Sequence, residues 1–197
     1  EVKLLFDPFC GSGTIAIEGC SILAGFPPGR FRSPPLQGTT LCDPALWDEI
    51  KALSLSADEN GRVLVAANDI NKEAIKAAKS NAERAGVEQF IDFTTGSFKQ
   101  HPLLKSSTEP ISDSDSLLLV TNPPYGKRLS APSESKPSTY KQLSKAISFS
   151  PYNIRCAVIG KDIRSLRASS LPLQVAFSTK HGGLNVIAMT GTTDDNE

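Results

Sequence analysis

Apolar residues along the chain fall into short continuous runs that alternate with longer segments of helical spacing. Short runs bounded by turn residues are typical of buried strands, and they lie at residues 2–6, 63–67, 90–94, 117–121, 156–159, 173–178 and 184–190. Apolar residues spaced three and four apart are typical of amphipathic helices, and they lie within residues 14–24, 43–53, 72–85 and 140–149. This alternation predicts an α/β fold with a doubly wound, mostly parallel seven-stranded sheet. The sequence KHGG at 180–183, between the last two runs, predicts a C-terminal antiparallel hairpin.

Two stretches interrupt the alternation within what we expect to be a single domain over residues 1–197. Residues 26–60 form an insertion, rich in Pro and Gly at first, with an extra helix that begins at Asp43 and Pro44 and packs into the core through Trp47. Residues 100–116 are rich in Ser, Pro and acidic residues, which predicts a polar surface loop. Because the first apolar run begins at once, we expect a domain excised from a longer protein.

Charge and composition exclude several classes of protein. Lys and Arg total 21, and so do Asp and Glu, so the chain as a whole offers no attraction to a polyanion. The four cysteines have no Cys-x-x-Cys spacing, which indicates reduced thiols in a reducing compartment. The two histidines, His101 and His181, are expected at the surface, and the sequence predicts no metal site. No apolar stretch is long enough to predict a membrane span.

The first motif that indicates chemistry is DPFCGSGT, residues 7–14, directly after the first apolar run. Gly11 and Gly13 permit a tight turn that brings the backbone close to a ligand. The turn has no Lys, unlike the loops that hold nucleotide phosphates, whereas the Asp7 carboxylate can meet the cationic amino-acid end of S-adenosyl-L-methionine. A glycine turn can also serve only a tight strand-to-helix junction. Cofactor-binding residues predicted in this turn are Asp7, Phe9, Cys10, Gly11, Gly13 and Thr14.

Two further strand ends carry candidate cofactor contacts. Asp69 follows the second run, where an acidic residue can accept both ribose hydroxyls of a nucleoside. A helix cap or a solvated loop acid is the alternative for Asp69. Ile70 is the neighbouring candidate, and Ser97 follows the third run, where it can meet the adenine amino group.

The second motif is Asn122-Pro123-Pro124-Tyr125, directly after the fourth run. An exocyclic amine on a base is a poor nucleophile, because its lone pair is delocalised into the ring. The Asn122 side-chain oxygen and the Pro123 carbonyl can fix its two N–H bonds, while Pro124 stiffens the turn without adding a donor. Tyr125 can stack on a flipped base. These four residues are the predicted catalytic residues, and the two motifs together predict methyl transfer from S-adenosyl-L-methionine to a nitrogen.

Three segments, residues 7–18, 68–87 and 121–129, resemble the RNA guanine-N2 methyltransferases that carry an N-terminal THUMP domain. The resemblance implies a Rossmann-like class I methyltransferase fold, S-adenosyl-L-methionine as cofactor and a guanine in ribosomal or transfer RNA as acceptor. It also implies that structured RNA is held partly by an N-terminal domain that this chain lacks. Ser97 departs from the Asp that is common at its position, and the loop at 100–116 is longer than usual.

Other interpretations remain open at this point. The same catalytic motif serves N-methylation of adenine N6 in nucleic acids or of glutamine in proteins, and a fold of this kind can also act as a non-catalytic binding module. Lys127 and Arg128 are candidate RNA contacts. We expect the protein in the cytoplasm or, since the insertions are rich in Ser, in an organelle such as the chloroplast.

Overall fold

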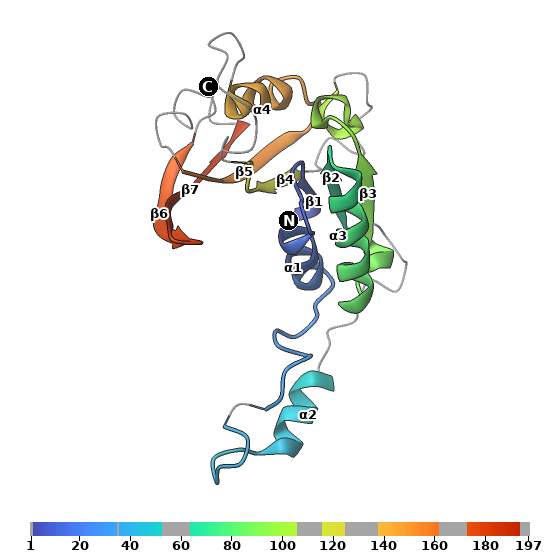
Figure 1. Cartoon of the computed structure of the whole chain (residues 1–197), viewed down its shortest axis with the longest axis vertical. Coiled ribbons are helices and arrows are strands. Elements are labelled where there is room, and N and C mark those ends of the chain that lie inside the picture. Colours follow the sequence, from blue (N-terminus) through green and yellow to red (C-terminus); the bar gives the residue numbers. More distant parts are fainter. Residues whose placement is uncertain are drawn as a thin grey trace.

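The computed structural model describes residues 2–34, 36–52, 64–105, 116–124, 138–161 and 173–193, and its centre is one twisted sheet (Figure 1). The seven strands are β1 (Val2–Asp7), β2 (Val65–Asp69), β3 (Ile91–Thr95), β4 (Ser116–Thr121), β5 (Asn153–Gly160), β6 (Gln174–His181) and β7 (Leu184–Thr192). They lie in the order β3-β2-β1-β4-β5-β7-β6. The first five are parallel, and the hairpin of β6 and β7 joins antiparallel to β5. The predicted sheet and its C-terminal hairpin are confirmed.

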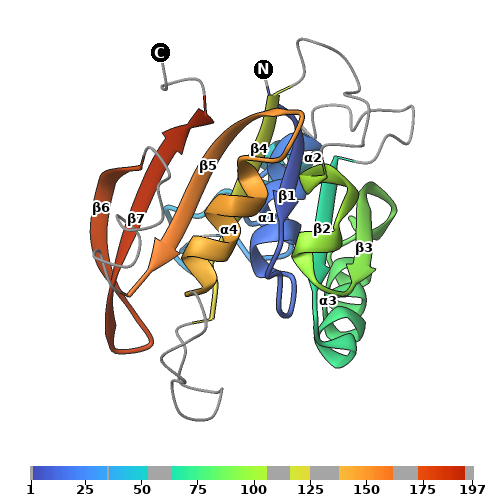
Figure 2. The ribbon, with the colours of Figure 1, turned by 90° about the horizontal axis from the view of Figure 1, so that it is seen from above.

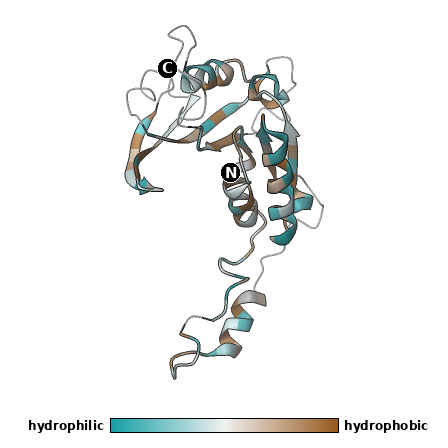
Figure 3. Cartoon of the chain, viewed as in Figure 1, coloured by the Kyte–Doolittle hydropathy of each residue, from teal (hydrophilic) through white to brown (hydrophobic). Residues whose placement is uncertain are grey.

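Helices cover both faces of the parallel part of the sheet (Figure 2). In the described part of the chain the α-helices are α1 (Thr14–Leu23), α2 (Pro44–Ala52), α3 (Lys72–Arg84) and α4 (Thr139–Ile147), and the 3-10 turns are η1 (Glu88–Phe90), η2 (Phe98–Gln100) and η3 (Pro102–Leu104). Helices α1 and α3 pack on one face, with α4, η2 and η3 on the other. Figure 3 colours α3 largely as hydrophilic, in agreement with the few residues that it buries.

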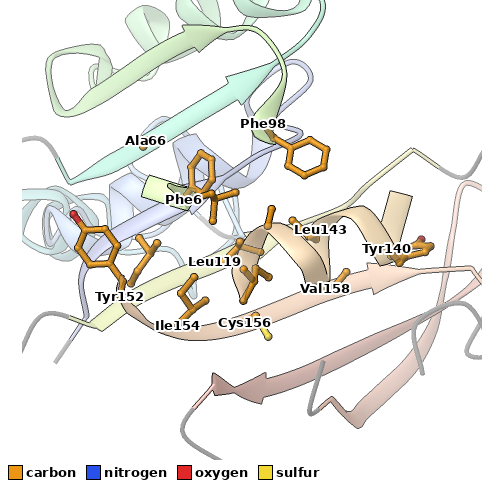
Figure 4. Close-up of a cluster of buried hydrophobic side chains, with 14 of the residues drawn as sticks. Phe6, Ala66, Phe98, Leu119, Tyr140, Leu143, Tyr152, Ile154, Cys156 and Val158 are labelled. Atoms are coloured by element: carbon orange, nitrogen blue, oxygen red, sulfur yellow. The ribbon is translucent and has the colours of Figure 1, made fainter. Parts of the chain in front are cut away.

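Alternating side chains of the central strand belong to two separate cores. On β1, Leu5 belongs to the core under α1 and α3, while Phe6 belongs to the core under α4. Figure 4 shows this second core, where Phe6 and Leu119 lie beside Leu143 of α4. These three side chains are fully buried, and burial of each stabilises the fold by about 1.5–3 kcal/mol.

The strand order creates a switch point between β1 and β4. The chain runs from β1 outward through β2 to β3, and then returns to place β4 on the other side of β1. Connections therefore leave the carboxyl ends of β1 and β4 in opposite directions, which is where ligands bind in open α/β sheets. The first sequence motif begins at Asp7, the last residue of β1, and the second directly follows Thr121, the last residue of β4.

Two residues lie elsewhere than the sequence predicts. Trp47 is only half-buried and belongs to neither core, because α2 extends away from the sheet (Figure 1) and Trp47 donates its indole N–H to the Arg32 carbonyl oxygen at 3.3 Å. His101 is buried rather than exposed, because η2 and η3 fold back so that its ring stacks on Phe6 with centroids 4.4 Å apart. The side chain of His181, and residues 106–115 of the predicted polar loop, lie outside the described residues.

Candidate active site

The turn after β1 is built by backbone hydrogen bonds and by two glycines with positive φ. The Gly13 N–H donates to the Cys10 carbonyl at 2.8 Å, and the Cys10 N–H donates to the Asn68 carbonyl at 2.9 Å. Gly11 has a φ of 53° and Gly13 a φ of 89°, in the left-handed region that favours glycine. The turn is thus fixed against the end of β2.

The two glycines have different reasons for lacking a side chain. A Cβ on Gly13 would lie 3.1 Å from Cβ of Ala78 and 3.3 Å from Cδ1 of Ile17, so this glycine permits α1 and α3 to pack closely. A Cβ on Gly11 would meet nothing within 4 Å among the described atoms. Gly11 therefore borders open space among the described atoms, whereas the lack of a side chain at Gly13 is required by the packing of α1 and α3.

Asp7 is buried at the base of this turn, with 1% of its surface exposed. Its Oδ1 accepts hydrogen bonds from the Thr121 hydroxyl at 2.7 Å and from the Phe9 N–H at 3.1 Å. Burial raises the pKa of Asp7 to about 6, and repulsion from Asp69 adds to the rise, while the two hydrogen bonds oppose it. Both donors use Oδ1, so among the described residues Oδ2 has no donor and is available to a cationic ligand.

Asp69 lies at the end of β2 and braces the same turn. Its Oδ2 accepts from the Gly11 N–H at 3.0 Å, and its Oδ1 accepts from the Asn71 N–H at 2.8 Å. Asn71, and not Asp69, is the N-cap of α3, since its side chain accepts from the Glu73 N–H at 2.9 Å. A carboxylate has about four acceptor sites, so half-buried Asp69 can still accept hydrogen bonds from ligand hydroxyls.

The remaining predicted cofactor residues lie at the same edge of the sheet. Ile70 exposes 77% of its surface directly after Asp69. Ser97 is half-buried and follows Gly96, whose missing side chain leaves open space within 4 Å among the described atoms. Phe9 packs against Phe98 with ring centroids 4.8 Å apart, while Thr14 is exposed at the start of α1 and Cys10 is buried.

Asn68 is a residue of this site that the sequence analysis did not assign. Its side chain is buried, and Nδ2 donates to the carbonyl oxygens of Pro8 at 3.3 Å and Gly96 at 3.1 Å, while Oδ1 accepts from the Thr94 hydroxyl at 3.0 Å. Asn68 thereby joins the turns after β1 and β3. The signal in the sequence is a lone amide in an otherwise apolar strand, directly before Asp69.

The turn after β4 holds an unpaired acceptor. Oδ1 of Asn122 is buried and has no hydrogen-bond partner among the described residues. Pro123 is buried and Pro124 is exposed, while Tyr125 lies outside the described residues. A buried acceptor without a donor costs about 1–3 kcal/mol, so a group that donates to Oδ1 of Asn122 would be stabilised at this position.

The cysteine of the first turn is held in its neutral, weakly nucleophilic form. Burial, and then repulsion from Asp7 and Asp69, raises the pKa of Cys10 to about 12, so the thiol is neutral. All four cysteines are free.

The described residues contain no cluster of three metal-ligating side chains. No helix in the described part of the chain is long and apolar enough to cross a bilayer.

Comparison with known proteins gives consistent matches over most of the chain. The model of the family "UPF0020: RMKL-like, methyltransferase domain" matches residues 1–167. Ribosomal RNA large subunit methyltransferase K/L of Legionella pneumophila (strain Lens) is 34% identical over 145 residues, which is 73% of this chain and 19% of that protein. The protein of the same name from Shewanella sp. (strain MR-4) is 32% identical over 185 residues, 91% of this chain and 24% of that protein. The chain thus spans about a fifth of the length of these relatives.

One solved structure supports the same fold. The crystal structure of a possible methylase from Clostridium difficile 630 superposes with a TM-score of 0.73 and 26% sequence identity. The match covers 95% of this chain and 47% of that chain.

Proposed function

Since the chain belongs to the RMKL-like methyltransferase domain family, UPF0020, we propose that it methylates the exocyclic N2 amine of a guanine in ribosomal RNA. The chain is a methyltransferase domain, and its methyl donor is S-adenosyl-L-methionine. The names of the relatives support ribosomal RNA as the acceptor. The guanine N2 position rests on the resemblance of residues 7–18, 68–87 and 121–129 to guanine-N2 methyltransferases.

The residues at the switch point fit the methyl donor. Oδ2 of Asp7, which has no donor among the described residues, would hold the ammonium group, and the Asp69 carboxylate would accept the ribose hydroxyls. Exposed Ile70 offers an apolar surface for the adenine ring, and Ser97 a hydroxyl for its amino group. When bound there, S-adenosyl-L-methionine supplies an electrophilic methyl group on a sulfonium.

The observation that carries the proposal is that Oδ1 of Asn122 is buried and has no hydrogen-bond partner among the described residues. In the proposed mechanism this oxygen accepts one N–H of the amine, and the Pro123 carbonyl accepts the other, which fixes the nitrogen lone pair in one direction. Neither proline can offer Asn122 a backbone N–H in competition. The amine loses its proton after transfer, so the mechanism requires orientation and no strong general base.

RNA affinity is proposed to depend on a domain outside this chain. Equal numbers of basic and acidic residues give the chain no general attraction to phosphate. Lys127 and Arg128, which lie outside the described residues, are the proposed local contacts.

Asn122→Ala tests the acceptor site. We expect it to bind S-adenosylhomocysteine with near wild-type affinity and to lose about a hundredfold in single-turnover rate, because the amine is no longer oriented. Asn185→Ala is the matched control, since Asn185 is exposed on β7 away from the switch point. A single-turnover rate for Asn122→Ala equal to that of Asn185→Ala would remove Asn122 from the mechanism.

A further inference from the structure

Thr121 connects the two turns of the site. It is the last residue of β4, directly before Asn122, and it is completely buried. Its hydroxyl donates to Oδ1 of Asp7 at 2.7 Å across the adjacent strands β1 and β4, although the two residues are 114 positions apart. A buried hydroxyl needs a hydrogen-bond partner. The partner of the Thr121 hydroxyl is Asp7, the residue proposed to bind the cofactor.

This bond decides which oxygen of Asp7 is left for a ligand. Oδ1 receives the Thr121 hydroxyl and the Phe9 N–H, so Oδ2 has no donor among the described residues. Among the described residues, the titratable group whose charge acts on Asp7 is Asp69, which opposes its ionisation. The Cys10 thiol on the same turn is neutral and adds no charge. Against burial and the Asp69 charge, the Thr121 hydrogen bond favours the ionised carboxylate.

We propose that Thr121 is a positioning residue for cofactor binding, whose hydroxyl holds the Asp7 carboxylate with Oδ2 free for the ammonium group of S-adenosyl-L-methionine. This inference rests on the proposed function, because it is the proposed function that places the ammonium group of the cofactor at Asp7. Because Thr121 is bonded directly to Asn122, the same hydrogen bond ties the cofactor turn to the turn that orients the acceptor amine. A displacement of the Asp7 side chain would therefore also displace the backbone at Asn122, where the turn after β4 begins.

Calorimetric titration with S-adenosylhomocysteine, which carries the same amino-acid group, tests the proposal in Thr121→Val and Thr121→Ser. Valine keeps the shape and removes the hydroxyl, whereas serine keeps the hydroxyl. We expect Thr121→Val to bind about tenfold more weakly than wild type at pH 6.5 and within about threefold at pH 8.5, because Asp7 without this bond ionises at higher pH. Thr121→Ser should stay near wild type at both pH values. Comparison at one pH cancels the titration of the ligand itself.

A double-mutant cycle separates positioning from packing. In the Asp7→Asn background, Thr121→Val should have little further effect on affinity, because the carboxylate on which it acts is gone. Thr121→Ala serves as the second hydroxyl-free variant if the buried valine prevents folding.

The outcomes are distinct. Equal affinity of wild type and Thr121→Val at both pH values overturns the proposal and leaves the proposed function intact. An equal loss in the Val and Ser variants shows a packing role and also overturns it. Absence of S-adenosylhomocysteine binding by the wild-type protein contradicts the cofactor site itself, and with it both proposals.

Discussion

The burial of Asp7 makes the stability of the ligand-free protein depend on pH in a way that Asp7→Asn should remove. Its pKa rises from an ordinary value of 3.8 to about 6 on folding. Because the folded pKa is the higher one, the folded state binds the proton more tightly. The stability from Asp7 is therefore fully present below about pH 4 and is lost as the pH rises through 6. Each pH unit in that window changes the unfolding free energy by about 1.4 kcal/mol.

Urea denaturation at pH 5.0 and pH 7.5, followed by circular dichroism, measures this effect. Between these values wild type should lose about 1.4 kcal/mol more unfolding free energy than Asp7→Asn. Other titrating groups, including buried His101, whose pKa burial lowers, are the same in both proteins and cancel. Equal pH dependence of the two proteins would refute the reasoning, because it would mean that Asp7 is not buried as an acid of raised pKa.

Two further predictions follow from the glycine turn and the thiols. Gly13→Ala should destabilise the protein by about 2 kcal/mol or more in urea denaturation, because positive φ adds to the close contact with Ala78. Gly11→Ala should lower the unfolding free energy by only about 1 kcal/mol, and its main effect should be weaker S-adenosylhomocysteine binding. Equal losses of unfolding free energy in the two variants would contradict the different roles given to the two glycines. Alkylation with iodoacetamide at pH 8, followed by mass spectrometry, should label half-buried Cys42 first. Burial raises the pKa values of the other three thiols, Cys10, Cys20 and Cys156, to about 11 or 12. Rapid labelling of any of these three would contradict their burial in the two cores.

The sheet was predictable because its signals are local. Each apolar run needs only its own residues and the turn beside it to indicate a strand, and the Asp7 and Asn122 motifs stand directly after such runs. The rules for open α/β sheets then place both motifs at one edge, where the structure has them.

The contacts within the site were not predictable because they join residues far apart in the chain. Thr121 looks like an ordinary strand residue until β4 lies beside β1, and only then does its hydroxyl meet Asp7. Similarly, Asn68 gains its role when the turns after β1 and β3 come together.

The errors at His101 and Trp47 have a related physical cause. A lone histidine among polar residues gives no sign that 3-10 turns will fold it against Phe6. The helical spacing around Trp47 predicts α2 correctly, but spacing cannot tell which surface, if any, covers a helix.

The most direct test of the central claim is methyl transfer from tritiated S-adenosyl-L-methionine to ribosomal RNA, followed by mass spectrometry of the nucleosides. Transfer RNA, DNA and protein serve as parallel acceptors, and Asn122→Ala as the inactive control. The account predicts label in ribosomal RNA as N2-methylguanosine, lost in Asn122→Ala. Label as N6-methyladenine, in protein glutamine or in transfer RNA alone would contradict the proposed acceptor, and S-adenosylhomocysteine binding without label in any acceptor would contradict the catalytic role.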